Sequence, residues 1–321
     1  MFTCRYSTVQ IPQSPYWKRN PSDEYTITGV SSLNRPMDAT LLFANQPITE
    51  FPDISGSIII LIPGSGALSS TLASRNCILV APNPRLAYAV LLSHILAGVS
   101  EPEFRQLCNG SFVATTAIVA EGAKIGHSVY VGHKSVIGAG TIVKSGAKIA
   151  EFVLVGENCI IGENTVIGNQ GFGVERTPTG DSVRIPHVGG VIIGDSVYVG
   201  ALNTIVAGTI APTIVEDHVQ TDDHVHIAHN CHIKRGTHIT ACVEISGSVT
   251  IGEKCTIGPN ASLMNKISIG ASSTVGLGAV VTKSFGEGVT LAGNPADIMD
   301  NIRALRRALN SLMAQDIRVS L

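Results

Sequence analysis

The sequence is poor in charged and aromatic residues. Of its 321 residues, 14% are Asp, Glu, Lys or Arg, 5% are aromatic, and the formal net charge is −2. Proteins that bind nucleic acid or anionic membranes by electrostatic attraction carry an excess of basic residues. The composition therefore argues against both classes of partner.

Disulfide patterns and long aliphatic runs are also missing. The seven cysteines are scattered and form no Cys-x-x-Cys motif, which is typical of a reducing compartment rather than of a disulfide framework. The aliphatic run Ile58–Ile62 ends at Pro63-Gly64 and is too short to span a bilayer. The first residues lack the apolar core of a signal peptide. We therefore expect a soluble, cytoplasmic protein without a transmembrane segment.

The sequence does contain a six-residue period of aliphatic residues. From Ile227 to Val281 every sixth residue is Ile, Val or Leu, and a second run from Val113 to Ile167 keeps the same period. A lone helix has a period of about 3.6 and a simple strand a period of about 2. The period of six predicts a parallel β-helix, in which each hexad forms one side of a coil and points its aliphatic residue inward. Three hexads close one triangular turn, so that residues 18 apart stack.

The period divides the chain into three expected regions. Residues 1–108 lack it, and their short apolar runs and a helix capped by Asn83 predict a small α/β domain. Residues 109–295 are expected to form the β-helix, so the fold class is mainly β. Residues 296–321 predict a C-terminal helix with an apolar stripe. We expect that stripe to self-associate.

The period slips between Ile167 and Ile193, and slips back between Ile205 and Ile227. The first slip contains Gly171-Phe172-Gly173, two prolines and a further glycine, and predicts a loop that leaves the coil wall. Loops of this length in a compact repeat are usually functional.

The densest polar cluster lies at Thr221–His232. Because Ile227 points inward, His229 should lie at a corner, with Gly247 and then Asn265 stacked beside it on the next coils. A histidine base next to a glycine N–H is the arrangement that acyl transfer requires, since the imidazole accepts a proton and the N–H stabilises the oxyanion. Asp222 or Asp223 could hold the tautomer of the ring. The alternative is a corner histidine that is solvated or bonded to a neighbouring coil.

Metal chemistry is a rival interpretation of the same histidines. His187, His224 and His229 could supply the three protein ligands of a catalytic zinc, as in the β-helical carbonic anhydrases, whose histidines have similar spacing and lie across a subunit interface. No sequence rule places His187 beside the other two. The catalytic site is therefore expected to hold no metal.

Five groups of residues between positions 25 and 295 follow one another in a characteristic order. They are Ile27-Thr28-Gly29-Val30, Asn83-Pro84 with Tyr88, Gly171-Phe172-Gly173, Arg184-Ile185-Pro186 with Gly189, and Asp222 with Ile227-Ala228-His229-Asn230. In these segments and their order the chain resembles UDP-3-O-(3-hydroxyacyl)glucosamine N-acyltransferase, an enzyme family of bacterial lipid A and lipopolysaccharide biosynthesis within the hexapeptide-repeat acyltransferases.

The resemblance implies a homotrimer of left-handed β-helices with active sites between subunits, a uridine-binding N-terminal domain, and acyl carrier protein or CoA as the acyl donor, without a resident cofactor. It implies His229 as the general base that deprotonates the amine, Asp222 as its acidic partner and Gly247 as the oxyanion donor. Phe43 and Asn45 match the stretch that contacts uracil. Asp223 and Lys266 are further candidates for substrate binding. A bacterial, cytoplasmic location follows from the same resemblance.

The chain departs from the family at several positions. Val206-Ala207 replaces an Asp-Arg pair, Lys266 replaces a second histidine, and the stretch around Phe43 lacks a tyrosine. Gly293-Asn294-Pro295 is common in sugar acetyltransferases that use acetyl-CoA. The acyl length, the donor, the nucleotide sugar and the position of the amine therefore stay open.

Three functions follow for testing. The first is N-acyl transfer from acyl carrier protein or CoA to the amine of a nucleotide-linked amino sugar. The second is transfer from acetyl-CoA, and the third is a zinc-dependent lyase or a scaffold without catalysis. If the donor is acyl carrier protein, which is acidic, Arg303, Arg306 and Arg307 are candidate docking residues; the alternative is a solvated helix face.

Overall fold

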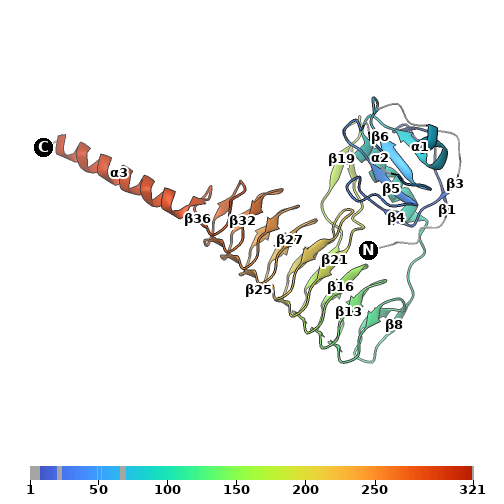
Figure 1. The fold of residues 1–321 in the computed structure, drawn as a ribbon. Coiled ribbons are helices and arrows are strands. Elements are labelled where there is room, and N and C mark those ends of the chain that lie inside the picture. The colour runs from blue at the N-terminus through green and yellow to red at the C-terminus, as the bar shows by residue number, and fades with distance from the viewer. Residues whose placement is uncertain (1–7, 20–23, 49, 52, 66–69, 320–321) are drawn as a thin grey trace. The chain divides into compact units, whose positions relative to one another are not determined.

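The computed structural model describes residues 8–19, 24–48, 50–51, 53–65 and 70–319. These residues form two compact units (Figure 1). Of the described residues, the first unit contains those up to 102 together with 170–190 and 208–211, and the second contains 103–169, 191–207 and 212–319. This division differs from the three contiguous regions expected from the sequence, because the segment inserted at residues 170–190 belongs to the first unit.

The first unit is built on a five-stranded sheet with strand order β2-β7-β6-β5-β4. Strands β4 to β7 are parallel and β2 is antiparallel to β7. The strands are β2 (Lys18–Arg19), β4 (Gly29–Val30), β5 (Thr40–Phe43), β6 (Ile58–Leu61) and β7 (Cys77–Val80). A separate antiparallel pair joins β1 (Thr8–Gln10) to β3 (Glu24–Thr26). The short apolar runs of the sequence thus form strands as expected, because their aliphatic side chains are buried in this unit.

Two helices accompany this sheet, α1 (Ser70–Arg75) and α2 (Pro84–Ala97). The N-cap residue of α2 is Asn83, whose side chain accepts the N–H of Leu86 at 3.0 Å. Pro84 fits the first helical position because its missing N–H would have no partner there. Helix α2 was expected from this pattern, whereas α1 was not.

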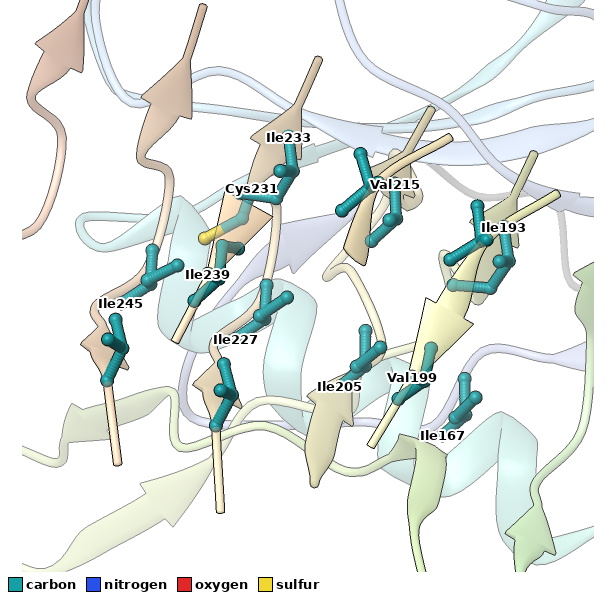
Figure 2. Close-up of a cluster of buried hydrophobic side chains, with 14 of the residues drawn as sticks. Ile167, Ile193, Val199, Ile205, Val215, Ile227, Cys231, Ile233, Ile239 and Ile245 are labelled. Carbon is teal, nitrogen blue, oxygen red and sulfur yellow. The ribbon is translucent and has the colours of Figure 1, made fainter. Parts of the chain in front are cut away.

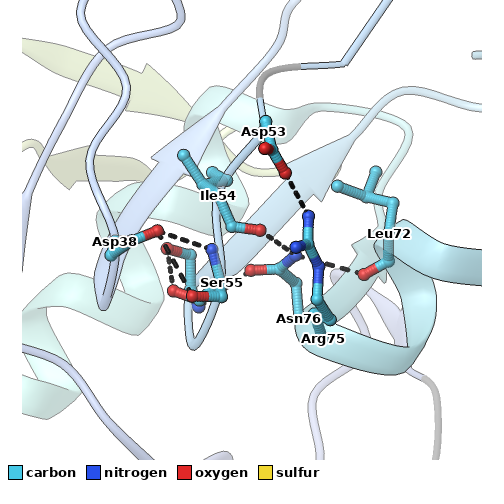
Figure 3. A network of polar contacts seen from close by, with 8 residues as sticks. Asp38, Asp53, Ile54, Ser55, Leu72, Arg75 and Asn76 are labelled. Atoms are coloured by element: carbon cyan, nitrogen blue, oxygen red, sulfur yellow. Dashed lines mark hydrogen bonds and ion pairs between the residues drawn. The ribbon is translucent and has the colours of Figure 1, made fainter.

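A polar network fixes the connection between β5 and β6 against α1 (Figure 3). The Nδ2 group of Asn76 donates to the carbonyl oxygens of Ile54 (2.9 Å) and Leu72 (3.1 Å), and Arg75 pairs with Asp53. The N–H of Ser55 donates to Asp38 at 2.7 Å. The bonds of Asn76 satisfy buried polar groups next to the sheet, which would otherwise cost free energy, whereas the contacts of Ser55 and Arg75 are exposed.

The second unit is a parallel β-helix with three faces, each a sheet whose strands come from successive coils. Face 1 has eight strands: β10 (Ile118–Val119), β13 (Val136–Ile137), β16 (Val153–Val155), β21 (Val191–Ile193), β24 (Thr213–Val215), β27 (His232–Ile233), β30 (Thr250–Ile251) and β33 (Ser268–Ile269).

Faces 2 and 3 have ten strands each. Face 2 contains β11 (Lys124–Ile125), β14 (Ile142–Val143), β17 (Ile160–Ile161), β22 (Tyr198–Val199), β25 (Gln220–Thr221), β28 (His238–Ile239), β31 (Thr256–Ile257), β34 (Thr274–Val275), β36 (Thr290–Ala292) and β37 (Asp297–Ile298). Face 3 contains β8 (Phe104–Gln106), β9 (Phe112–Ala114), β12 (Tyr130–Val131), β15 (Lys148–Ile149), β18 (Val166–Asn169), β23 (Thr204–Val206), β26 (His226–Ile227), β29 (Glu244–Ile245), β32 (Ser262–Leu263) and β35 (Val280–Val281).

The aliphatic residues of the hexads fill the interior of this coil (Figure 2). Ile227 pairs with Ile245 and Ile245 with Leu263, so residues 18 apart stack as expected. At the two slips in the period, the residues that stack are more than 18 positions apart. Ile167 pairs with Ile205, and Ile205 pairs with Ile227.

Glycines that follow the inward aliphatic residues are required by the close stacking of the coils. A Cβ atom on Gly132 would lie 2.7 Å from the backbone carbon of Ala150, and one on Gly126 would lie 2.7 Å from the backbone nitrogen of Ser145. The left-handed conformation is instead adopted two residues later, at positions such as Ser128 and Asn230. Gly126 and Gly132 are therefore needed for space between coils, whereas at other corners Gly140 and Gly146 themselves adopt the left-handed conformation (φ 69° and 75°).

The unit ends in α3 (Met299–Val319), which begins three residues later than expected. Its apolar stripe is exposed at Leu305, Leu309, Leu312 and Met313. Among the described residues, none of the helices combines the length and the apolar character needed to cross a membrane.

The interior predicts a large effect of truncating one inward residue. Ile245→Ala removes a fully buried side chain and should lower the free energy of unfolding by about 2–5 kcal/mol, because the rigid coils cannot close the cavity. Thr256→Ala, at an exposed outward position of face 2, is the control and should change it by less than about 0.5 kcal/mol. Urea unfolding followed by circular dichroism measures both; equal stability of the two variants would contradict the assignment.

Candidate active site

His229 lies at the corner between face 3 and face 1, in the turn that joins β26 to β27. It is half-buried and does not belong to the hydrophobic interior. The corner follows from Ile227, whose buried side chain fixes the strand so that the chain turns immediately after it. A histidine at this place can meet a ligand outside the coil.

Gly247 and Asn265 occupy the same corner on the next two coils. The N–H of Ser248 donates to the carbonyl oxygen of His229 at 2.8 Å, and the N–H of Lys266 donates to that of Gly247 at 3.0 Å. The imidazole of His229 packs directly against Gly247, where a Cβ atom would lie 2.6 Å from Cε1 and 2.7 Å from Nε2. The stacking expected from the 18-residue spacing is therefore present, and glycine is the residue that leaves room for the ring.

Asn230 holds the other side of the ring. Its Oδ1 atom lies 3.0 Å from Nδ1 of His229. Because an amide oxygen only accepts, Nδ1 carries the proton and Nε2 carries the lone pair. Nε2 is thus the nitrogen that can take a proton from an attacking group. Sequence reasoning missed this role, although the adjacent position of Asn230 and the tolerance of asparagine for the left-handed conformation (φ 59°) gave a signal.

Asp222 and Asp223 lie at a different corner of the coil, between face 2 and face 3. Asp222 accepts the N–H of Asp223 at 2.8 Å, and Asp223 accepts the N–H of Ala201 at 2.7 Å. A strand of face 3 separates this corner from His229 along the chain. Within one chain the structure therefore joins His229 with Asn230 and Gly247 but places the two aspartates elsewhere.

Lys266 follows Asn265 at the corner of His229, two coils further on. Its side chain is exposed and its backbone adopts the left-handed conformation (φ 62°) that is shared with Asn230 and Ser248. Its ammonium group is therefore on the same edge of the coil as the imidazole.

The predicted nucleotide stretch lies in the first unit. Phe43 ends β5, and its ring centroid is 4.8 Å from that of the buried Tyr88 in α2. Burial raises the pKa of Tyr88, so the phenol is neutral. Asn45 is exposed in the following turn. The same unit has a cavity of about 300 Å³. It is lined by Leu33 and by three residues that follow Asn45 in the sequence, Ile48, Glu50 and Phe51.

The three histidines of the metal hypothesis occupy different settings. His187 is buried in the first unit, and its Nδ1 donates to the carbonyl oxygen of Ile185 at 2.9 Å. His224 is exposed at the corner between faces 2 and 3, whereas His229 lies at the next corner. Within the part of the chain that the structure describes, no group of three or more His, Cys, Asp or Glu side chains could hold a metal ion.

The bond from Asn230 predicts a selective effect of two substitutions. Asn230→Gly tolerates the left-handed backbone but removes the acceptor for Nδ1, so turnover should fall about tenfold as the tautomer and the ring orientation are lost. Asn230→Asp keeps an acceptor and should retain most of the activity. Steady-state kinetics with the substrates proposed below measure both, and equal rates for the two variants would show that this contact does not position the ring.

Comparison with known proteins shows what the six-residue repeat is similar to. Residues 134–169 match a family model described as bacterial transferase hexapeptide (six repeats). A stretch of 54 residues is 41% identical to a UDP-3-O-acylglucosamine N-acyltransferase of Campylobacter curvus and 39% identical to one of Campylobacter concisus. In each comparison the stretch makes up 17% of this chain and 17% of the relative, so the match spans about a sixth of the length of these curated relatives.

Solved structures match over a larger part of the chain. LpxA from Acinetobacter baumannii superposes with a TM-score of 0.54 at 24% identity, covering 62% of this chain and 75% of that one. UDP-N-acetylglucosamine O-acyltransferase (LpxA) from Moraxella catarrhalis gives 0.53 at 25% identity, covering 60% and 75%. The likeness shows the fold, a left-handed parallel β-helix, and confirms the mainly β class expected from the sequence. The hexapeptide repeat and the resemblance to this group of acyltransferases are confirmed as well.

Proposed function

We propose that this hexapeptide-repeat protein is an acyltransferase that moves an acyl group from a pantetheine thioester to the amine of a nucleotide-linked amino sugar of the UDP-3-O-acylglucosamine type. The observation that carries the proposal is the packing of the His229 imidazole on Gly247, with Nδ1 bound by Asn230. The names of the curated relatives support the acceptor class.

The geometry supports a direct transfer. Nε2 of His229 takes a proton from the sugar amine while the amine nitrogen attacks the thioester carbonyl. The carbonyl oxygen becomes an oxyanion, which the N–H of Gly247 stabilises. When the tetrahedral intermediate collapses, the C–S bond breaks, the new amide remains on the sugar, and the pantetheine sulfur receives the proton from the imidazolium.

A second copy of the chain completes the site in this proposal. The outward positions of face 1 form a column of aliphatic side chains in direct register: Ile118, Val136, Leu154, Ile192 and Ile214. Face 1 borders the corner that holds His229, so a neighbouring coil packed on this column would lie beside the imidazole. Three such contacts close a homotrimer. In such a trimer Asp222 of one subunit would support His229 of a neighbouring subunit, because within one chain the two residues lie at different corners of the coil.

The donor and the nucleotide are assigned to separate surfaces. The exposed Arg303, Arg306 and Arg307 of α3 offer charge complementarity to an acidic acyl carrier protein. The edge with Asn265 and Lys266 would receive the pantetheine arm. Phe43 and Asn45 form the proposed uridine site, and the cavity lined by Leu33, Ile48, Glu50 and Phe51 lies in the same unit.

The experiment is a thiol-release assay with purified protein. Acyl carrier protein thioesters of several chain lengths and acetyl-CoA are each combined with UDP- and dTDP-linked amino sugars and with UDP-N-acetylglucosamine as a hydroxyl acceptor. We expect release with an acyl carrier protein thioester and an amine acceptor. Release only with acetyl-CoA would favour the alternative indicated by Gly293-Asn294-Pro295, and no release with any pair would reject the proposal.

A further inference from the structure

The hairpin inserted between two coils has one face docked on α2 and the other exposed. Strands β19 (Val174–Arg176) and β20 (Ser182–Arg184) pair antiparallel, with Glu175 opposite Val183. Glu175 accepts from Nη1 of Arg85 at 2.9 Å and from Nδ2 of Asn83 at 3.2 Å, both at the start of α2. Figure 1 shows β19 beside that helix. The single acidic residue of the two strands is thus used in docking.

The opposite face of the hairpin carries two arginines. Arg176 and Arg184 alternate with Glu175 and Val183 in the antiparallel register, so they project from the side away from α2. Both are exposed. The remaining acid of the hairpin, Asp181, lies in the turn, where it accepts from the hydroxyl of Thr179 at 2.7 Å. The exposed face is therefore cationic although the protein as a whole is slightly acidic.

An aromatic ring stands next to Arg184, whereas Arg176 lies further along the same face and donates to the carbonyl oxygen of Gly180 at 3.1 Å. Phe172 is 78% exposed between the buried Gly171 and Gly173, and the guanidinium carbon of Arg184 lies 5.7 Å from its ring centroid. Arg184 also donates to the carbonyl oxygen of Gly171 at 3.0 Å. Exposing a phenylalanine to water is unfavourable, so a ligand that covers the ring would gain its burial.

The backbone that carries Phe172 is built to hold it still. The imidazole of His187 packs against Gly171, where a Cβ atom would lie 2.5 Å from Nε2. Gln170 clamps the same histidine by accepting its backbone N–H (2.8 Å) and donating to its carbonyl oxygen (3.0 Å). The N–H of Ile185 donates to the carbonyl oxygen of Gly173 at 2.8 Å. A ring fixed in this way loses little conformational entropy when it binds a ligand.

We propose that this aromatic–arginine face, defined by Phe172, Arg176 and Arg184, binds a nucleoside diphosphate. The base stacks on the open side of the Phe172 ring, and the phosphates meet the two guanidinium groups. The inference deepens the proposed function, on which it rests for the source of the nucleotide. Two substrates share this chemistry. One is the nucleotide end of CoA, which leaves Phe43 and Asn45 for the uridine, and the other is the nucleoside diphosphate of the acceptor sugar, whose binding here would replace those two residues as the uridine site. Acyl carrier protein has no base to stack.

Calorimetric titration of the full chain with UDP, uridine and CoA, without turnover, tests the face. Phe172→Ala should weaken the binding of the preferred nucleotide about tenfold, the usual effect of losing a stacking partner, and Phe172→Trp should retain it. Arg176→Gln should weaken UDP more than uridine, with a loss that shrinks at high salt. Phe112→Ala, which removes another exposed aromatic ring in the coil, and Arg235→Gln, which removes an arginine paired with Asp217, are the controls and should leave affinity unchanged.

The results distinguish UDP from CoA as the bound nucleotide, and they separate this inference from the proposed acyl transfer. A loss confined to UDP assigns the face to the acceptor, and a loss confined to CoA assigns it to the donor; either supports the inference. Unchanged affinity for both ligands in Phe172→Ala and Arg176→Gln, or no binding of either by the unaltered protein, overturns it. A protein that binds nucleotide through Phe172 but transfers no acyl group would retain this inference and reject the proposed function.

Discussion

His229→Ala should lower kcat/KM by about 100-fold or more, because the amine then loses the base that removes its proton. The substitution lies at a half-buried corner outside the hydrophobic interior, so the fold should persist and the nucleotide should still bind. The effect should appear in kcat rather than in KM, since the imidazole acts as the proton moves.

The matched control is His238→Ala. His238 projects from face 2 at an exposed outward position, so its loss tests the removal of an imidazole from the coil without touching the proposed site. Initial rates of thiol release and melting temperatures measure both variants. If His229→Ala keeps a rate within about twofold of the unaltered protein, His229 is not the base.

Gly247→Ala should lower kcat by about 100-fold although it adds a single methyl group. The Cβ atom would lie 2.6 Å from Cε1 of His229, closer than non-bonded atoms approach, so the ring must move by about an ångström. A displacement of that size can cost about 100-fold when it separates a catalytic group from its target. Gly247 is not in the left-handed region, so its backbone accepts alanine and stability should change little.

Gly286→Ala is the control for this change, because a Cβ atom there meets no other atom within 4 Å and its φ is also ordinary. The double variant His229→Ala/Gly247→Ala gives a sharper test. If alanine at 247 acts by displacing the ring, the double variant should be no slower than His229→Ala, a non-additive result that reports coupling between the two positions. Additive losses would show that Gly247 acts independently of the imidazole.

Much of the architecture could be predicted from the hexad. A residue such as Ile245 is buried because its position in the period points it inward, and this requires no knowledge of distant parts of the chain. The stacking of His229 on Gly247 follows from the same repeat, because residues 18 apart lie on neighbouring coils. The helix after Asn83 was predictable because capping is a local interaction of a side chain with the next turn.

Other parts depended on contacts between distant residues. The carboxylate of Glu175 meets Arg85 some ninety positions away, and no local pattern reveals that residues 170–190 join the N-terminal unit. Asp222 and His229 are seven residues apart in sequence, but within one chain a strand of face 3 separates their corners, so the pairing implied by the resemblance is a proposal about two subunits. The sequence shows an asparagine at position 230 but does not show that its side chain contacts Nδ1 of His229. The direction of that side chain depends on the left-handed backbone conformation at the corner.

The sequence by itself determined the coil, its interior and the stacking of every eighteenth residue, because a strict repeat sets the same local geometry at each step. Only the tertiary structure decided which groups hold the imidazole, and that the inserted hairpin turns its acid toward α2 and its arginines and Phe172 outward. Those outcomes depend on side-chain orientation and on packing between segments far apart in the chain, which periodicity does not encode.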